Sequence, residues 1–505
     1  LTSAFGGLII GLGIDFVIVL YARYVEERQR GASHAEAVDA MGRHTGVGVL
    51  LGAVTTAATF YSFLVTDFAG LWDLGLLTGT GILLLVVTVF LLLPALLTMI
   101  QQHLRSDRPL ILRSFGFEKL CRVSLRRPVL TIALAVVVTV VLGIGARGLR
   151  WDDDFRNMRS GDNRAIQLRQ QVMDAFDLRF SPMVLRFDGA TEGEALAKCR
   201  AILPELEGLV DGENLVGIDT IAGVIPPVED QELLLARLDE AAPVVDGLVP
   251  RFEAALRNNG LNPASFQDGI AHLMTALKRR ELLSLTDLED TPLARVVDRY
   301  VAAGGGEVSA AIYCYPPVGQ WRRGASPALE SLLSKHPGAV LAGPNVISAE
   351  LRKIVWDDAI KAAILGIVVV FLLMWSDLGG PLRALLALLP LFVGMVWMLG
   401  GMALLGLRLN FFNIFVLTMI VGIGVDYGIH LLHRWYESGG DPAALSETSG
   451  AIAVAALTTM VGFGSLVISH YPGLQSVGAA AILGALSTAV LGITVLPALL
   501  SMKEE

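Results

Sequence analysis

The stretch Gly11-Leu12-Gly13-Ile14-Asp15-Phe16 is repeated 411 residues later as Gly422-Ile423-Gly424-Val425-Asp426-Tyr427. A second stretch, Leu93-Pro94-Ala95-Leu96-Leu97, is repeated 403 residues later as Leu496-Pro497-Ala498-Leu499-Leu500. Both copies run in the same direction, and the two offsets differ by one loop of about eight residues. The sequence therefore predicts a duplicated unit whose two copies form a parallel repeat.

The composition is that of a membrane protein. The 505 residues are 53% apolar and 17% charged, with a mean hydropathy of +0.60. Soluble domains carry about 25% charged residues, and soluble chains of this length divide into domains with wet surfaces. The net charge of −9 provides no basic surface for DNA or RNA. These values exclude a water-soluble enzyme, a disordered chain and a nucleic-acid binder.

Nine segments are long and apolar enough to span a bilayer, which takes about 20 residues. Three lie in a first membrane block, residues 1–100, and five in a second block, residues 357–502; a basic connector, 101–127, precedes the span 128–148. The predicted spans are 4–24, 46–66, 71–100, 128–148, 357–375, 382–405, 411–433, 450–469 and 475–500.

Lysine and arginine are distributed unevenly among the short loops. The loop after the first span holds four arginines and the connector 101–127 holds seven basic residues, whereas the loops 67–73 and 470–475 hold none. Basic loops face the cytoplasm. We therefore expect a multi-pass membrane protein whose polar stretch 149–356 lies outside the cytoplasm.

The polar stretch is long enough to fold by itself. Phe180–Phe187, Val308–Tyr315 and Gly338–Ala342 have strand composition, and residues 192–209 and 327–335 have helical patterns. A charged helical insertion is expected at about 229–303, so the prediction is an α/β domain with a helical insertion. Cys199 and Cys314 share this stretch, and the spacing leaves open whether they form a disulfide.

Asp15 and Asp426 lie deep inside their predicted spans, at matched positions of the repeat. Intramembrane carboxylates are costly unless they face a bundle interior, a partner or water, and they mark ion pathways. A second carboxylate and an apolar setting both favour the protonated form, so this pair is suited to exchanging protons near neutral pH. His430 lies one turn beyond Asp426 and is a candidate to extend the relay.

Small and hydroxyl-bearing residues accompany the two aspartates. Gly11 and Gly422 lie one turn before them and allow close helix approach. Thr55, Thr458 and Ser465 are candidate hydrogen-bond partners on neighbouring spans. The alternative for these hydroxyl groups is a bond to the backbone of their own helix, and the alternative for His430 is an imidazole that only packs near the interface.

The duplicated motif, the Leu-Pro-Ala-Leu-Leu closing spans and the outer domain resemble the resistance–nodulation–division (RND) superfamily, in particular its mycobacterial-membrane-protein-large (MMPL) and hopanoid exporter-like type. The resemblance implies an RND-type helix bundle in the bacterial inner membrane, with nine of twelve spans present. It also implies that the stretch 149–356 is a ferredoxin-like porter domain in the periplasm. Because the sequence starts at Leu1 within an apolar segment, we expect it to be truncated at its N-terminus. The first block then matches spans four to six of the family.

By this resemblance, Asp15 and Asp426 match the proton-relay aspartates of the family, and Tyr427 matches the tyrosine that follows. Phe16 departs from the pattern because it lacks that hydroxyl group. The implied function is a secondary active transporter, driven by the proton gradient without a cofactor or metal, that exports lipid or hydrophobic cargo; it is not an enzyme. The alternatives are a drug-efflux pump, a sterol-sensing-like lipid-binding protein and a secretion accessory factor. Membrane lipids are the expected partners, and homo-oligomerisation stays open.

Overall fold

The computed structural model describes residues 5–103, 116–152, 155–158, 163–175, 182–226, 228–288, 290–304, 306–317 and 325–502. The chain divides into two compact units, and each is described by itself. The first comprises Leu1–Gln167 and Ala349–Glu505, and the second comprises Leu168–Ser348.

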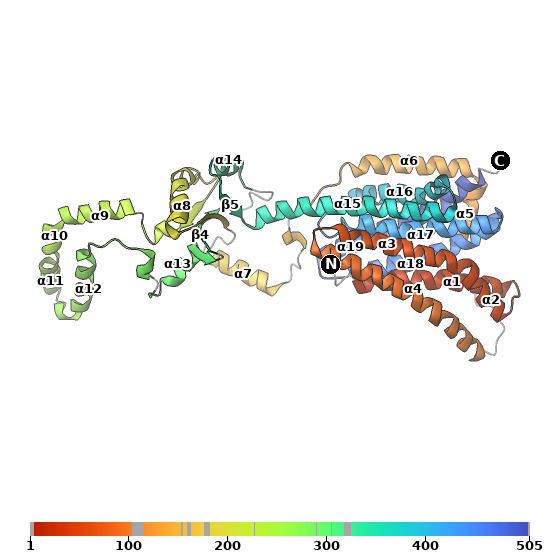
Figure 1. The fold of residues 1–505 in the computed structure, drawn as a ribbon, viewed down its shortest axis with the longest axis horizontal. Helices are drawn as coiled ribbons and strands as arrows, with labels where there is room; N and C mark the ends of the chain where they lie inside the picture. The colour runs from red at the N-terminus through yellow and green to blue at the C-terminus, as the bar shows by residue number, and fades with distance from the viewer. Residues whose placement is uncertain are drawn as a thin grey trace. The chain divides into compact units, whose positions relative to one another are not determined.

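The first unit is a bundle of long helices (Figure 1). Among the residues that the structure describes, eight helical stretches are long and apolar enough to cross a membrane. α1, which contains the first predicted span, is not among these eight, so the number nine stays a prediction. The helices of this unit are α1 (Phe5–Gln29), α2 (His34–Ala40), α3 (Gly46–Tyr61), α4 (Ala69–His103), α5 (Phe117–Arg126), α6 (Pro128–Ala146), α15 (Pro344–Leu378), α16 (Pro381–Leu404), α17 (Val416–Glu437), α18 (Pro442–Val467) and α19 (Pro472–Ser501).

The sequence repeat is also a structural repeat. A methyl group added at Gly75 in α4 would lie 2.5 Å from the carbonyl oxygen of Phe60. A methyl group at Gly478 in α19 would lie 2.6 Å from the carbonyl oxygen of Phe463. Both pairs are related by the offset of 403, so α4 packs on α3 as α19 packs on α18. Glycine is needed at both places because only a hydrogen atom fits against the neighbouring backbone.

The two repeats exchange partners in the bundle. α1 of the first repeat packs against α18 of the second, and α17 of the second packs against α3 of the first. The core of the bundle therefore lies between the copies as well as within them, and residues from both repeats meet at the centre.

Two further features hold the bundle together. The carboxylate of Asp358, fully buried in α15, accepts the backbone N–H groups of Asp67 and Phe68 at 2.9 and 3.0 Å. These donors precede the first turn of α4 and would otherwise lack partners. In the connector, α5 packs against α18 and α19 and buries Cys121 and Ser124. The amphipathic connector helix is therefore part of the bundle.

The second unit contains a small antiparallel sheet in the order β2-β4-β1-β5. Its strands are β1 (Met183–Gly189), β2 (Gly217–Thr220), β4 (Glu307–Tyr315) and β5 (Ala339–Ala342), and β3 (Val301–Gly304) pairs with the other half of β4. α8 (Glu192–Glu207) connects β1 to β2, and α14 (Pro327–Lys335) connects β4 to β5. With β3 set aside as the hairpin partner of β4, the order β1, α8, β2, β4, α14, β5 is a β-α-β-β-α-β connectivity.

One apolar core fills the space between the sheet and its helices. Alternate residues of β1 are buried, as expected of a strand with one face on a core. Cys199 of α8 and Cys314 of β4 both belong to this core, and both are free thiols. The predicted first strand begins at Met183; the residues 176–181 lie outside the described part of the chain.

The insertion between β2 and β3 is helical. It contains α9 (Val228–Glu240), α10 (Ala242–Asp246), α11 (Leu248–Asn258), α12 (Gln267–Lys278) and α13 (Ala294–Tyr300). The loop from β3 to β4 is a tight hairpin in which Gly304 pairs with Glu307. Gly306 has a φ of 87°, a left-handed conformation that favours glycine.

Candidate functional site

Asp15 lies in α1 and accepts hydrogen bonds from two hydroxyl groups of α18. Thr458 donates to Oδ1 at 3.1 Å, and Thr459 donates to Oδ2. Gly11, one turn earlier, faces the same helix: a methyl group added there would lie 3.7 Å from the Cα atom of Gly462. The small residue at this point lets the two helices approach closely enough for the hydroxyl groups to reach the carboxylate.

Asp426 lies in α17 and faces α3. Thr56 approaches Oδ2 at 3.4 Å and donates at 3.0 Å to the carbonyl oxygen of Gly422. Oδ1 is buried and has no hydrogen-bond partner among the described residues. Gly52 lies against it, since a methyl group added there would lie 2.9 Å from Oδ1. This carboxyl group is therefore tightly packed and only partly satisfied.

Each aspartate thus lies within hydrogen-bond distance of threonines of the opposite repeat. Thr459 and Thr56 are equivalent in sequence by the offset of 403, as are the two aspartates by the offset of 411. The arrangement is reciprocal but unequal, because Asp15 accepts two hydroxyl groups and Asp426 is approached by one. The side chains also interact electrostatically with one another.

Tyr427 is 3% exposed, and its hydroxyl group lies close to Thr459 and within electrostatic range of both aspartates. It makes no hydrogen bond of standard geometry with the described residues. A buried hydroxyl group without a partner is uncommon and requires an explanation. Phe16, its counterpart, is equally buried but apolar, so only the second repeat carries a hydroxyl group here.

His430 lies one turn beyond Asp426 on the same face of α17. A methyl group added at Gly48 would lie 3.3 Å from its Nδ1 atom. Three residues of α3 spaced four apart, Gly48, Gly52 and Thr56, therefore face His430, Asp426 and Gly422 in turn. His430 also lines a cavity of about 390 Å³, at the end of the bundle where Arg23 and Arg434 lie.

The predicted hydroxyl partners have different outcomes. Thr458 reaches Asp15, whereas Thr55 donates to the carbonyl oxygens of Leu51 and Gly52 in its own helix. Ser465 donates to the carbonyl oxygen of Gly462, also in its own helix. For Thr55 and Ser465 the structure shows the backbone-bonded alternative.

Sequence reasoning missed Thr56, Thr459 and Gly52. The paired threonines were visible as Thr55-Thr56 and Thr458-Thr459. The missing signal was helical phase: Gly48, Gly52 and Thr56 repeat every four residues, the same spacing as Gly422, Asp426 and His430. Matching these two ridges would have selected Thr56 over Thr55.

The sequence profile of the MMPL family matches residues 4–131 and 254–503. The chain belongs to the MMPL family. Within it, the chain is 26% identical over 95% of its length to the hopanoid transporter HpnN of Burkholderia multivorans, and 26% identical over 97% to that of Rhodopseudomonas palustris. It spans 58% and 59% of these two relatives.

Two further similarities concern size and fold. The putative membrane protein MJ1562 of Methanocaldococcus jannaschii is 25% identical over 77% of this MMPL chain, which covers 94% of that protein. Among solved structures, SecDF in its super-membrane-facing form aligns with a TM-score of 0.51 and 16% identity, over 99% of this chain and 54% of the SecDF chain. This likeness shows the fold alone. The apolar helices and these relatives agree with a membrane protein of the MMPL family.

Proposed function

We propose that this protein is a proton-driven exporter of lipid or other hydrophobic molecules in a bacterial inner membrane. The observation that carries the proposal is the reciprocal placement of Asp15 and Asp426, each facing threonines of the opposite repeat. Carboxyl groups placed at a repeat interface inside a helix bundle are typical of proton relays in transporters.

The threonines provide a switch that follows the charge of the carboxyl groups. Thr458 lies within hydrogen-bond distance of Asp15 at 3.1 Å and of the carbonyl oxygen of Ala455 at 2.7 Å. Thr56 lies between two acceptors of the opposite helix, Asp426 at 3.4 Å and the carbonyl oxygen of Gly422 at 3.0 Å. An ionised aspartate accepts hydrogen bonds from these hydroxyl groups. Protonation of the aspartate makes one of its oxygens a donor, and the threonine hydroxyl group then donates to the backbone carbonyl oxygen instead.

The switch acts between repeats because donor and acceptor belong to different copies. Protonation of Asp15 weakens the contact of α1 with α18, because Thr458 then donates within its own helix. Protonation of Asp426 shifts the hydrogen bond of Thr56 by one turn along α17, from Asp426 to Gly422. A change of charge at one carboxyl group thereby favours a different packing of the two copies, which is the kind of two-state element that alternating access requires.

The lipid cargo is supported by the relatives named as hopanoid transporters. In our proposal the basic loops face the cytoplasm and the second unit, with its β-α-β-β-α-β connectivity, is a ferredoxin-like porter domain in the periplasm. Cargo would pass through that domain while protons cross the bundle. The proposal applies to the intact protein, since this chain spans 58% of its Burkholderia relative.

The test is proton flux in proteoliposomes of the intact protein under an imposed pH gradient, with and without extracted envelope lipids. Asp426→Asn and Asp15→Asn should each lower lipid-stimulated flux by about 100-fold or more, the scale of a lost acid–base group. Asp73→Asn is the matched control, because Asp73 is exposed near the N-terminal end of α4. Unchanged flux in Asp426→Asn refutes the relay and favours a lipid-binding sensor. Stimulation by small drugs instead of lipids favours drug efflux.

A further inference from the structure

An arginine and a glutamate follow each aspartate at the same spacing. Arg23 and Glu26 lie eight and eleven residues after Asp15, and Arg434 and Glu437 lie eight and eleven residues after Asp426. The spacing of eight puts each arginine on the helix face of its aspartate, two turns closer to the end of the helix. The duplication therefore includes charged residues as well as the relay motif.

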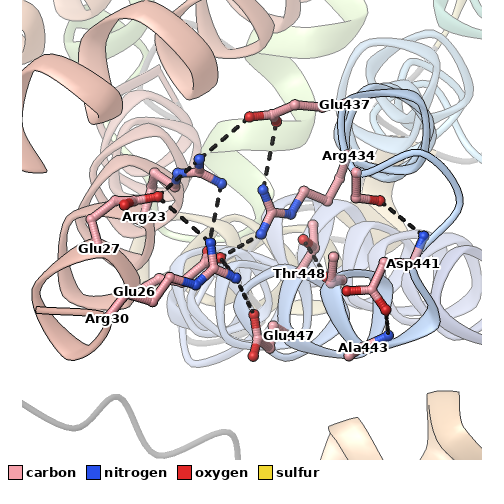
Figure 2. Close-up of polar contacts among 12 residues, drawn as sticks. Arg23, Glu26, Glu27, Arg30, Arg434, Glu437, Asp441, Ala443, Glu447 and Thr448 are labelled. Carbon is pink, nitrogen blue, oxygen red and sulfur yellow. Dashed lines mark hydrogen bonds and ion pairs between the residues drawn. The ribbon is translucent and has the colours of Figure 1, made fainter. Parts of the chain in front are cut away.

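These four residues pair across the repeats (Figure 2). Arg23 contacts Glu437 at 3.3 Å, and Arg434 contacts Glu26. Each arginine also contacts the glutamate of its own helix, at 3.8 and 3.6 Å. The arginine side chains are only 10% exposed. We call this group of four residues the cross-repeat clamp, because it joins the ends of α1 and α17.

The clamp borders the cavity of about 390 Å³ that His430 also lines. The other walls are matched between the repeats, with Thr45 in the position of Thr448 and Gly48 in that of Ala451. The Nε atoms of Arg23 and Arg434 are buried and have no hydrogen-bond partner among the described residues. Buried donors beside a polar cavity of this size are typical positions for bound water.

Several matched positions of the cavity lining differ between the repeats, among them Ala22 and His433, and the pair nearest the aspartates is the decisive one. His430 lines it from α17, and the equivalent residue in α1 is Val19, which also lines it. From His430 the same helix face continues to Asp426, with Gly48 and Gly52 providing the space beside both side chains. From Val19 the face continues to Asp15 without a polar group. The branch toward Asp426 therefore offers water an imidazole where the branch toward Asp15 has a valine side chain.

We propose that this cavity is a water-filled entrance from the basic end of the bundle to the carboxylate pair, closed by the cross-repeat clamp and connected through His430 to Asp426 rather than to Asp15. This inference deepens the proposed function and rests on it, since it names the side from which Asp426 exchanges protons. His430 and the clamp residues are positioning residues: the histidine orders water beside Asp426, and the clamp sets how open the cavity is.

The cavity is tested first by cysteine labelling of the intact protein in lipid nanodiscs, with a charged methanethiosulfonate reagent. Thr45→Cys and Thr448→Cys line the cavity, and Ala57→Cys in α3 is the buried control. The native cysteines give little background because all three are buried. We expect both cavity cysteines to react much faster than the control, and Glu437→Gln to accelerate the reaction of Thr45→Cys. Cavity cysteines as slow as the control, or a rate unaffected by Glu437→Gln, would overturn the inference.

Proton flux then tests the branch. His430→Val should lower flux by about tenfold or more, whereas His430→Gln, which keeps a group that hydrogen-bonds water, should stay within about twofold of the parent. Val19→Ala is the matched control in the other repeat and should be unaffected. Equal flux in His430→Val and the parent, or equal losses in the valine and glutamine variants, refutes the branch through His430.

The two experiments separate the inference from the proposed function. If Asp426→Asn leaves flux intact while the cavity cysteines react, the proposed function fails and the cavity remains. If Asp426→Asn abolishes flux while the cavity cysteines stay protected and His430→Val is normal, the function stands and the entrance is refuted.

Discussion

A methyl group at position 52 should disable Asp426 without unfolding the bundle. In Gly52→Ala the new Cβ would lie 2.9 Å from Oδ1 and 3.2 Å from Cγ of Asp426. Comfortable carbon contacts begin near 3.5 Å, so the carboxyl group must move by roughly half an ångström. Overpacking of this kind costs about 1–3 kcal/mol, which corresponds to a factor of about 5 to 150 in an equilibrium constant.

The displacement acts on the proton site in two ways. The contact from Thr56 to Oδ2 is already 3.4 Å long and breaks when the carboxyl group moves away from α3. The space beside Oδ1 is filled, so a proton or a water molecule reaches it less easily. We therefore expect flux to fall by about tenfold, with a loss of about 1–3 kcal/mol in unfolding free energy.

The assay combines proteoliposome flux with thermal unfolding of the same preparations. Gly42→Ala is the matched control, since a methyl group there meets nothing within 4 Å. Ala455→Gly is the reciprocal change, because Ala455 occupies the equivalent position in the second repeat. The reasoning is refuted if Gly52→Ala retains flux within about twofold of the parent. Such a result would mean that the added methyl group does not displace the carboxyl group of Asp426.

Three other outcomes follow from the described contacts. Tyr427→Phe should unfold at an equal or higher temperature, because an unpartnered buried hydroxyl group costs about 1–3 kcal/mol, while flux falls; a lower unfolding temperature would show that the hydroxyl group is bonded after all. Burial, with a hydrogen bond to Asp219, raises the pKa of Tyr300 to about 12, above the ordinary value of about 10. Its contribution to stability is therefore complete below about pH 10 and is lost as the pH rises through 12, and Tyr300→Phe should abolish that part of the alkaline loss in denaturant titrations. Burial raises the pKa of Cys199 and Cys314 to about 12, so iodoacetamide at about pH 8 should modify them only after unfolding, and rapid modification of the native protein would contradict this.

The repeat allowed much of the bundle to be predicted, because an offset of 411 ties α1 to α17 and an offset of 403 ties α3 to α18. The depth of Asp15 and Asp426 in apolar segments was also readable, since charge in such segments is rare. What the pattern could not show was the exchange of partners between copies. Hydrophobic periodicity identifies the buried face of a helix but not the helix that covers it.

The wrong predictions for the partners of Thr55 and Ser465 have the same cause. Thr55 and Thr56 differ by about 100° around the helix axis, and both sides of α3 are buried in this bundle. Burial alone therefore gave no reason to prefer one threonine over the other. The contact of α5 with α18 and α19 likewise depends on tertiary packing that no local signal encodes.

The exchange of partners also has a consequence for how the protein is made. The threonine that satisfies Asp15 lies 444 residues further along the chain. At a synthesis rate of about 5–20 residues per second, Asp15 waits roughly 20–90 s before Thr459 exists. Throughout that interval α1 carries a carboxyl group without its final partner. Insertion must therefore keep α1 sheltered, whether by the translocation machinery or by neighbouring helices, until α18 arrives to complete the site.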